Sequence, residues 1–255
     1  MRSQKRPTLL IFLIVIVTVI TAAAALRGSS SLIPPAQTNE EATPIKKGVM
    51  TGKQKRHSKL FSKFGTGKKI GELLIRNSDD LLIQLGTPMP GGDPGSPPLN
   101  RNRLLSETAC GADAIIVGKV VSKDSQLTDN EEFIFTDYQI QVEDTLNNSS
   151  GIQVNPGDEI TVTRPGGTIK LNNRIVKAVD KTLQPLSVGG HYVIFLQAVP
   201  ETNSFKAVSN VGSFRLRNGK VAKFTEEPFA ALFEEESANT LLTEIRNVIA
   251  GGCDR

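Results

Sequence analysis

The sequence predicts a mainly β domain with flanking helices, a small barrel or sandwich, placed behind an apolar N-terminal helix. Seven or so short segments with strand patterns follow one another after residue 113, and turn-forming residues separate them. The pattern changes to helical spacing only in the last stretch, Pro228–Ile249. Short strands closed by a terminal helix are typical of a small barrel or a sandwich.

The expected strands differ in the spacing of their apolar residues. Ala114–Ser122 and His191–Val199 are nearly continuous apolar runs, which are typical of buried strands. Phe133–Leu146 and Glu159–Arg164 alternate between apolar and polar residues, as half-buried strands do. The alternation in Phe133–Leu146 changes register near Thr136, and this change predicts a β-bulge at that point.

Turns and helices are marked by the residues that favour them. Pro156–Asp158 predicts a turn, and Asn172–Asn173 and Asn218–Gly219 predict hairpin turns because Asn and Gly tolerate positive φ. A short helix is expected over Arg103–Gly111. The acidic run 234–236 is expected to divide the terminal helical stretch into two helices.

Residues 1–26 are predicted to be a membrane-targeting segment. Three cations precede an apolar stretch of 18 residues, Leu9–Leu26, which contains no charged residue. As a helix this stretch would span about 27 Å, close to the roughly 30 Å hydrocarbon core of a bilayer. Cations on the cytoplasmic side leave the rest of the chain outside the cytoplasm.

Two outcomes fit this segment. It stays as a single-pass membrane anchor, or its block Leu9–Ile20 is the core of a signal peptide that is cleaved in the small-residue run Thr21–Ala25. The first outcome keeps the domain on the membrane, and the second releases a secreted or periplasmic protein. In both cases the N-terminal helix meets a membrane and the folded domain lies outside the cytoplasm.

Residues 27–100 are expected to form a basic, Pro- and Gly-rich stalk or linker. The block Lys46–Lys69 holds nine Lys or Arg and no acid, and is interpreted either as a solvated tether or as a segment attracted to an anionic surface. Ile70–Leu85 is predicted to be a short ordered piece with an apolar helical face that a polar run interrupts. Gly86–Pro98, with five Pro and four Gly, marks the boundary to the globular domain 101–255.

The net charge divides between these parts. Residues 1–100 carry 14 Lys and Arg against 6 Asp and Glu, whereas residues 101–255 carry 16 against 20. The pI of about 9.1 therefore reflects the N-terminal part and not the globular domain. A nucleic-acid-binding domain needs its basic surface on the folded module, so we expect no nucleic-acid partner.

Three stretches resemble a domain that is common in exported bacterial proteins of unassigned role. They are Cys110–Val120, Asn155–Val162 and Leu186–Leu196. Those domains are similar to the netrin and metalloproteinase-inhibitor module, which is an OB-type barrel of five strands with flanking helices. The resemblance covers residues 110–224, or extends to 250 with the helix, and implies a small OB-like barrel. The inhibitors of that family carry several disulfides and a free N-terminal Cys that meets the metal of the target, whereas Cys110 is internal.

The two cysteines, Cys110 and Cys253, bracket the globular domain. An extracytoplasmic compartment permits disulfides. A bond between them would close a loop of about 143 residues and tie the terminal helix to the start of the β region. The alternative is two free thiols. Neither cysteine has a CxxC partner, so zinc binding and thioredoxin-like redox chemistry are not expected.

The sequence shows no catalytic, cofactor-binding or metal-binding constellation. His57 lies in the basic block and His191 begins an apolar strand. Adjacent acidic residues on a strand point to opposite faces and do not converge as paired catalytic carboxylates do. We therefore expect a protein that is not an enzyme and has no cofactor. If it is an enzyme, His191 and Asp158 are the first candidates for its site.

The leading hypothesis is an extracytoplasmic binding or interaction module, tethered or secreted, whose partner is an extracytoplasmic protein or a cell-envelope polymer. OB-type barrels bind ligands on a strand face or between loops, so the expected loops Ser122–Glu132 and Pro165–Asn173 are candidate contact regions. The alternatives are a protease-inhibitor-like module, an envelope enzyme with an unrecognised site, and a structural spacer.

Overall fold

The computed structural model describes residues 43–44, 50–65, 67–76, 80–85, 100–180, 184–208, 212–222 and 232–253. All of them belong to one compact unit, Glu41–Arg255. The predicted targeting helix over residues 1–26 lies outside the described residues. Among the helices that are described, none combines the length and the apolar character that a membrane span requires.

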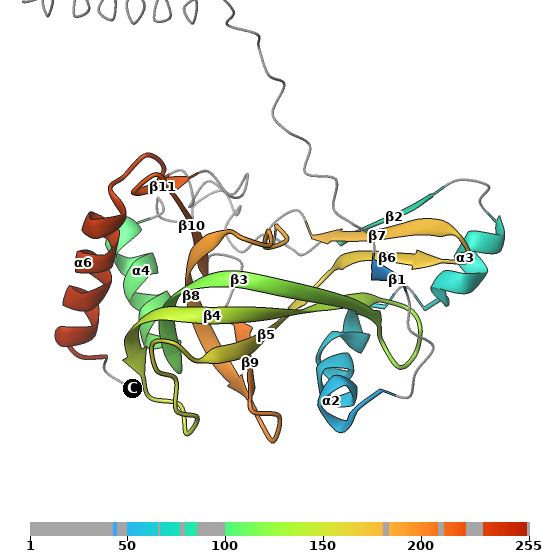
Figure 1. The fold of residues 1–255 in the computed structure, drawn as a ribbon, viewed down its shortest axis with the longest axis horizontal. Coiled ribbons are helices and arrows are strands. Elements are labelled where there is room, and N and C mark those ends of the chain that lie inside the picture. The colour runs from blue at the N-terminus through green and yellow to red at the C-terminus, as the bar shows by residue number, and fades with distance from the viewer. Residues whose placement is uncertain are drawn as a thin grey trace, which may run out of the picture. The chain divides into compact units, whose positions relative to one another are not determined.

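The larger of two sheets contains seven strands in the order β11-β10-β8-β3-β4-β5-β9 (Figure 1). β9 pairs with β8 as well as with β5, so five strands form a ring of pairings, β8-β3-β4-β5-β9, which we call the ring. The β5–β9 pairing is parallel and the other pairings of the ring are antiparallel. The strands are β3 Ala114–Leu127, β4 Ile134–Asn148, β5 Glu159–Pro165, β8 His191–Val199, β9 Ser204–Ala207, β10 Ser213–Arg217 and β11 Lys220–Ala222.

A second sheet of four strands has the order β1-β6-β7-β2. Its strands are β1 Thr43–Pro44, β2 Leu81–Leu85, β6 Gly167–Leu171 and β7 Arg174–Asp180. The turn between β6 and β7 places Asn172 at φ 52° and Asn173 at φ 62°, which is the backbone that two-residue hairpins favour. Asn218 and Gly219, at φ 53° and 74°, join β10 to β11 in the same way, so both predicted hairpins are confirmed.

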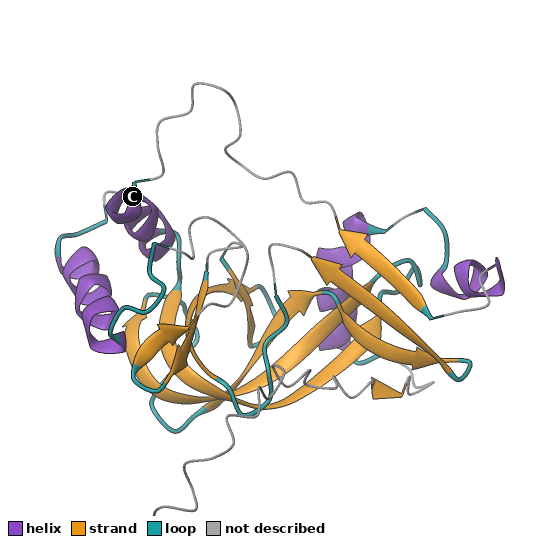
Figure 2. Ribbon diagram, turned by 90° about the horizontal axis from the view of Figure 1, so that it is seen from above, coloured by secondary structure: helices purple, strands orange, loops and turns teal. Residues whose placement is uncertain are grey.

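Helices flank these sheets, as Figure 2 shows by colour. They are α2 Gly52–Phe61, the 3-10 helix η1 Ser62–Phe64, α3 Ile70–Arg76, α4 Arg101–Cys110 and α6 Ala238–Ala250. In the described part of the terminal stretch, the helix is shorter than predicted. The acidic run 234–236 lies before the helix. Ser237 then caps α6, because its hydroxyl accepts a hydrogen bond from the backbone N–H of Thr240. The chain is therefore mainly β with flanking helices, as predicted.

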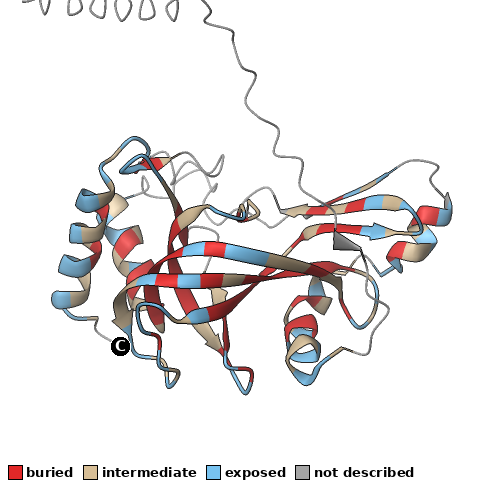
Figure 3. Cartoon of the chain, viewed as in Figure 1, coloured by how far each residue is buried: buried red, intermediate tan, exposed pale blue. Residues whose placement is uncertain are grey.

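The continuous apolar runs of β3 and β8 arise because both faces of these strands are buried (Figure 3). Ile116 and Ile194 point into the interior of the ring, where they pack with Tyr138. The alternate residues Ile115 and Phe195 pack on the opposite side under α4 and α6. A strand that is covered on two sides needs apolar residues at successive positions, and this is why the two runs show no alternation.

The predicted bulge near Thr136 is wrong. Thr136 pairs with Ser125 within a stretch of unbroken register, and the register shifts of the β3–β4 pair lie toward the other end of β3, between residues 115 and 122. The apparent change of pattern has another cause. The ring of Phe61 from α2 stacks on Phe135 at 6.0 Å, so the early part of β4 is buried on the face that becomes solvent-exposed further along.

The part of the expected stalk that is described does not behave as a solvated tether. Phe61, Ile70, Leu74 and Ile83 are buried in one cluster with residues of β4, β6 and β7. The expected helical face over Ile70–Leu85 is divided between α3 and the strand β2, which pairs in parallel with β7. These segments pack on the sheets because their apolar side chains complete a core whose other members come from β4, β6 and β7.

A pair of glycines leads the chain from the ring into the second sheet. Gly166 and Gly167 have φ of 85° and 142°, and a Cβ on Gly167 would lie 2.2 Å from the hydroxyl of Thr136. Residues other than glycine are strained at such φ and would collide with the neighbouring strand. The run Pro165–Gly167 therefore makes the tight transition between β5 and β6.

The disulfide Cys110–Cys253 is present, and its Cα atoms are 5.4 Å apart. It joins the end of α4 to the segment after α6.

Near the other end of α4, the guanidinium of Arg101 bonds to Glu236 and Glu244 at 2.6 Å each and lies over the ring of Phe233. Burial opposes the charge of Arg101, but hydrogen bonds to the two carboxylates outweigh it and raise its pKa.

We predict that the double variant Cys110→Ala with Cys253→Ala has a free energy of unfolding lower by about 2–5 kcal/mol, because its unfolded chain regains the freedom of a long loop. Denaturant titration of the oxidised protein and of the variant measures the difference. The reduced wild-type protein is the control and should match the variant. Coincident unfolding curves for the oxidised protein and the variant would contradict the prediction.

Candidate functional site

The helix α2 comes from the basic block, and its own sequence explains where it begins. The hydroxyl of Thr51 accepts a hydrogen bond from the backbone N–H of Gln54, and the side chain of Gln54 accepts one from the backbone of Thr51. This reciprocal capping box satisfies two backbone donors at the helix start. The helix buries only a narrow stripe, His57, Ser58 and Phe61, and exposes most of its cations.

His57 links this helix to two strands of the ring. Its Nδ1 lies 2.9 Å from a carboxylate oxygen of Asp137 on β4, and its Nε2 lies 2.6 Å from the hydroxyl of Ser204 on β9. The hydroxyl of Ser204 also bonds to Thr202, whose own hydroxyl donates to the carbonyl of Val199. His57 and Ser204 are completely buried. We call these five residues the His57 network.

The protons of the His57 network can be assigned by counting donors. Thr202 donates its single hydroxyl proton to Val199, so its oxygen accepts the proton of Ser204. The oxygen of Ser204 also faces Nε2 of His57, and Nδ1 of His57 faces the carboxylate of Asp137. Both ring nitrogens of His57 therefore have partners inside the network.

The order Asp137, His57, Ser204 resembles a serine-nucleophile triad, but the arrangement does not suit that chemistry. A general base must accept the proton of the serine, whereas Ser204 directs its proton to Thr202. A substrate also has no path to the buried hydroxyl. Moving α2 away to expose Ser204 would remove His57 as well, because His57 is part of α2. The network therefore positions α2 on the ring.

Three further contacts hold α2 on the strands. The ammonium of Lys53 bonds to the hydroxyl of Thr161 on β5 at 2.7 Å. The hydroxyl of Ser58 accepts the backbone N–H of Asp129 at 2.6 Å. Phe61 adds the apolar contact to β4 described above. The interface is thus mainly polar along α2 and becomes aromatic at its end.

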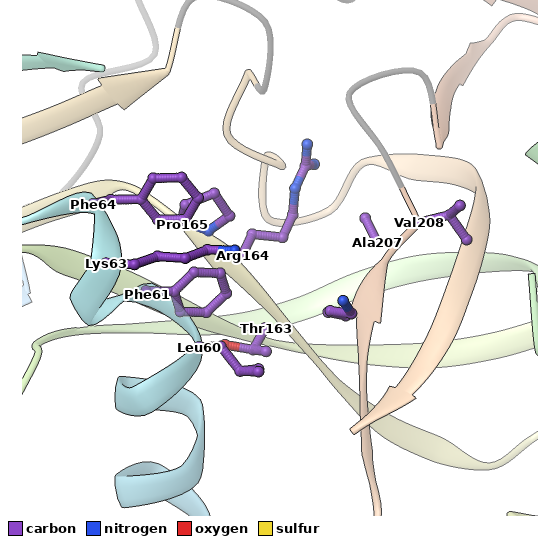
Figure 4. Close-up of a pocket in the computed structure, with 10 residues that line it drawn as sticks. Leu60, Phe61, Lys63, Phe64, Thr163, Arg164, Pro165, Ala207 and Val208 are labelled. Atoms are coloured by element: carbon purple, nitrogen blue, oxygen red, sulfur yellow. The ribbon is translucent and has the colours of Figure 1, made fainter. Parts of the chain in front are cut away.

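A pocket of about 190 Å³ opens beside this aromatic end, between the α2–η1 segment and strands β5 and β9 (Figure 4). Phe61 and Phe64 line it from the helical side, and their rings stack at 6.4 Å. Arg164, Pro165 and Lys206 are among the residues that line it from the strands. The pocket has this shape only while α2 is docked, because one wall belongs to α2 and η1.

The structure does not bring the two suspected catalytic residues together. His191 bonds to Glu143, with 45% of its side chain exposed, and Asp158 bonds to Asn155. His191 is thus a surface residue at a strand end. Within the described part of the chain, no cluster of three or more His, Cys, Asp or Glu side chains is arranged to hold a metal ion.

The two candidate contact regions are mostly strand and not loop. Residues 122–127 belong to β3, and residues 165–171 belong largely to β5 and β6. Their polar side chains are partly internal, because Ser125 bonds to Thr136 and Thr136 donates to the carbonyl of Gly166. Sequence reasoning placed them in loops because Gly, Asn and Asp residues interrupt their apolar patterns. Pro165 is the one residue of the two regions that lines the pocket.

Sequence reasoning missed the docking of α2, although a signal was present. Thr51 and Gln54 have the spacing of a capping box, and His57, Leu60, Phe61 and Phe64 recur at helical spacing. Together they predict a helix with one buried stripe inside the basic block. No sequence signal identifies the partners of His57.

Comparison with known proteins adds no further identification. No protein-family model matches the chain, and no curated protein matches it.

We predict that His57→Ala lowers the free energy of unfolding by about 3–5 kcal/mol, because it leaves the carboxylate of Asp137 buried without its partner. It should also speed tryptic cleavage within α2, after Lys53, Lys55 or Arg56. Denaturant titration and timed proteolysis with mass spectrometry measure both effects.

His191→Ala is the matched control for this variant. His191 makes an exposed ion pair with Glu143, so its loss should change stability by about 1 kcal/mol or less. Equal cleavage rates in α2 for the wild type and His57→Ala would show that the network does not hold the helix.

Proposed function

We propose that this chain is a non-enzymatic extracytoplasmic binding module, anchored in a membrane or released from it, whose ligand site is the pocket beside η1. The observation that carries the proposal is the pocket itself, which combines stacked aromatic rings with polar and charged groups. Small-molecule sites are typically concave and mostly apolar, with a few polar groups that orient the ligand.

The disulfide supports the location outside the cytoplasm. Disulfides form and persist in oxidising compartments and are rare in the cytosol. Cys110–Cys253 joins two helices of the globular region and closes a loop with a sequence separation of 143. The apolar segment Leu9–Leu26 provides the means of export in this proposal, as an anchor or as a cleaved signal.

We further propose that the ring is an OB-type barrel, related in architecture to the netrin-like module. Five paired strands and flanking helices fit that description. OB-type barrels often bind ligands on a strand face, and here α2 and η1 cover part of the outer face of β5 and β9 and leave the pocket at their edge. Protease inhibition of the netrin-like kind is less well supported, because Cys110 is internal to the chain and the sequence holds two cysteines, whereas those inhibitors carry several disulfides and an N-terminal Cys.

The location is tested by reporters fused to the C-terminus. Alkaline phosphatase, which needs an oxidising compartment, should be active in the fusion, and a fluorescent reporter that folds only in the cytoplasm should stay dark. A deletion of residues 1–26 is the control and should reverse both readouts. A bright fluorescent fusion of the full chain would overturn the proposed location.

The binding site is tested with a screen of small organic molecules of mixed charge against the full-length oxidised chain in detergent. We expect molecules that bind the wild type to lose about tenfold or more in affinity in Lys206→Trp, which fills the mouth of the pocket. Lys119→Trp, at an exposed position on β3, is the matched control and should leave binding unchanged. Hits that bind Lys206→Trp and wild type alike would overturn this assignment.

A further inference from the structure

The pocket concentrates positive charge. Lys63 of η1, Arg164 of β5 and Lys206 of β9 all line it, and no acidic residue is among the described residues of its lining. These three cations come from segments that are far apart in the sequence, and the fold brings them to one cavity. All three line a space that a ligand can enter.

Each cation contributes differently to anion binding. Arg164 is buried, with 3% of its surface exposed, and its guanidinium is directed away from Phe61 and Lys63, so it adds positive charge near the pocket without facing the phenylalanine walls (Figure 4). Lys63 is exposed, and its ammonium lies 5.3 Å from the centre of the Phe64 ring. Lys206 is half-buried on the strand side. An anion in the pocket would therefore meet the two adjustable ammonium groups of Lys63 and Lys206, with the charge of Arg164 nearby.

Thr163 provides an independent observation. It is completely buried in the wall of the pocket, and its hydroxyl oxygen has no hydrogen-bond partner within the described structure. Buried hydroxyl groups are nearly always paired, so an unpaired one at a cavity indicates a missing partner. An oxyanion that reached this wall after a small side-chain rearrangement would accept the proton of that hydroxyl.

The size and apolar surface of the pocket limit the rest of the ligand. Its volume of about 190 Å³ is close to the roughly 150 Å³ of an engineered apolar cavity that admits benzene. Phe61, Phe64 and Pro165 provide apolar contact area on its walls (Figure 4). One ring or a short branched alkyl group fits this space, whereas a typical drug-sized ligand requires more.

We propose that the pocket binds a small organic anion, a carboxylate or phosphate carried by one apolar ring or short alkyl group. The proposal rests on the proposed function and names its ligand class. The anionic group lies near Lys63, Lys206 and the hydroxyl of Thr163, and the apolar group packs on Phe61 and Phe64. No covalent step is involved.

Matched probes test this ligand class by calorimetry on the full-length oxidised chain in detergent. Phenyl phosphate and phenylacetate carry the anion and the ring, benzyl alcohol carries only the ring, 2-phenylethylamine carries the opposite charge, and inorganic phosphate lacks the ring. We expect each of the two ring anions to bind about tenfold or more tightly than any of the other three probes. Their affinity should fall as salt rises from 0.05 to roughly 0.5 M, because screening weakens the attraction.

Charge variants identify the residues. Lys206→Gln and Lys63→Gln should each weaken phenyl phosphate by about fivefold, the loss expected for one partly solvated charge near the anion, and leave benzyl alcohol unchanged. Lys206→Arg should retain the wild-type affinity, since it keeps the charge. Lys119→Gln, outside the pocket, is the control and should bind like the wild type.

The outcomes separate the two proposals. Benzyl alcohol binding as tightly as phenyl phosphate, or anion binding that is insensitive to Lys206→Gln and Lys63→Gln, would overturn the ligand class and leave the pocket as a binding site. Failure of all five probes, when other molecules of the mixed-charge screen bind at the pocket, would also overturn the ligand class alone. No binding by any molecule in either experiment would overturn both.

Discussion

The docking of α2 on the outer face of the ring is the interaction on which the candidate site depends. A buried hydrogen-bond chain runs from Asp137 through His57 and Ser204 to Thr202 and ties a helix of the basic block to β4 and β9. A buried polar pair contributes little net stability, because desolvation offsets much of the attraction, but removing one partner is costly. Such a pair favours one position of the helix over others, and that position creates the wall of the pocket.

The helices on the two sides of the larger sheet are held by different kinds of contact. On one side, α4 and α6 bury a continuous apolar cluster that includes Phe195, Phe214 and Phe233, and a disulfide ties the ends of the two helices. On the other, α2 buries mostly polar groups and exposes its cations. Apolar interiors are close-packed, and the pocket opens on the polar side instead, beside Phe61 of α2 and Phe64 of η1.

This division suits the binding function that we propose. The apolar side stabilises the domain, and the polar side, with Lys53 on Thr161 and His57 in its network, holds in place the edge at which we propose that a ligand binds. Preorganisation favours binding because less conformational freedom is lost when the ligand arrives. A site assembled from η1, β5 and β9 also explains why the cations that line it are scattered through the sequence.

The sequence by itself determined what depends on near neighbours. It located β3, β4, β5 and β8 of the ring, the turns at Asn172–Asn173 and Asn218–Gly219, and the break before α6, because spacing and backbone preference act over a few residues. It also left one possible disulfide, since the chain has two cysteines. The bulge near Thr136 was misplaced because burial by α2 imitates a register change.

Only the tertiary structure decided the ring closure, the partners of His57 and the pocket. Asp137 and Ser204 lie 80 and 147 residues from His57, and no local pattern encodes such pairings. The same is true of Lys63, Arg164 and Lys206, which read separately as solvated cations. Contacts of this kind exist only after distant segments pack, because burial, not sequence spacing, selects which polar groups must meet.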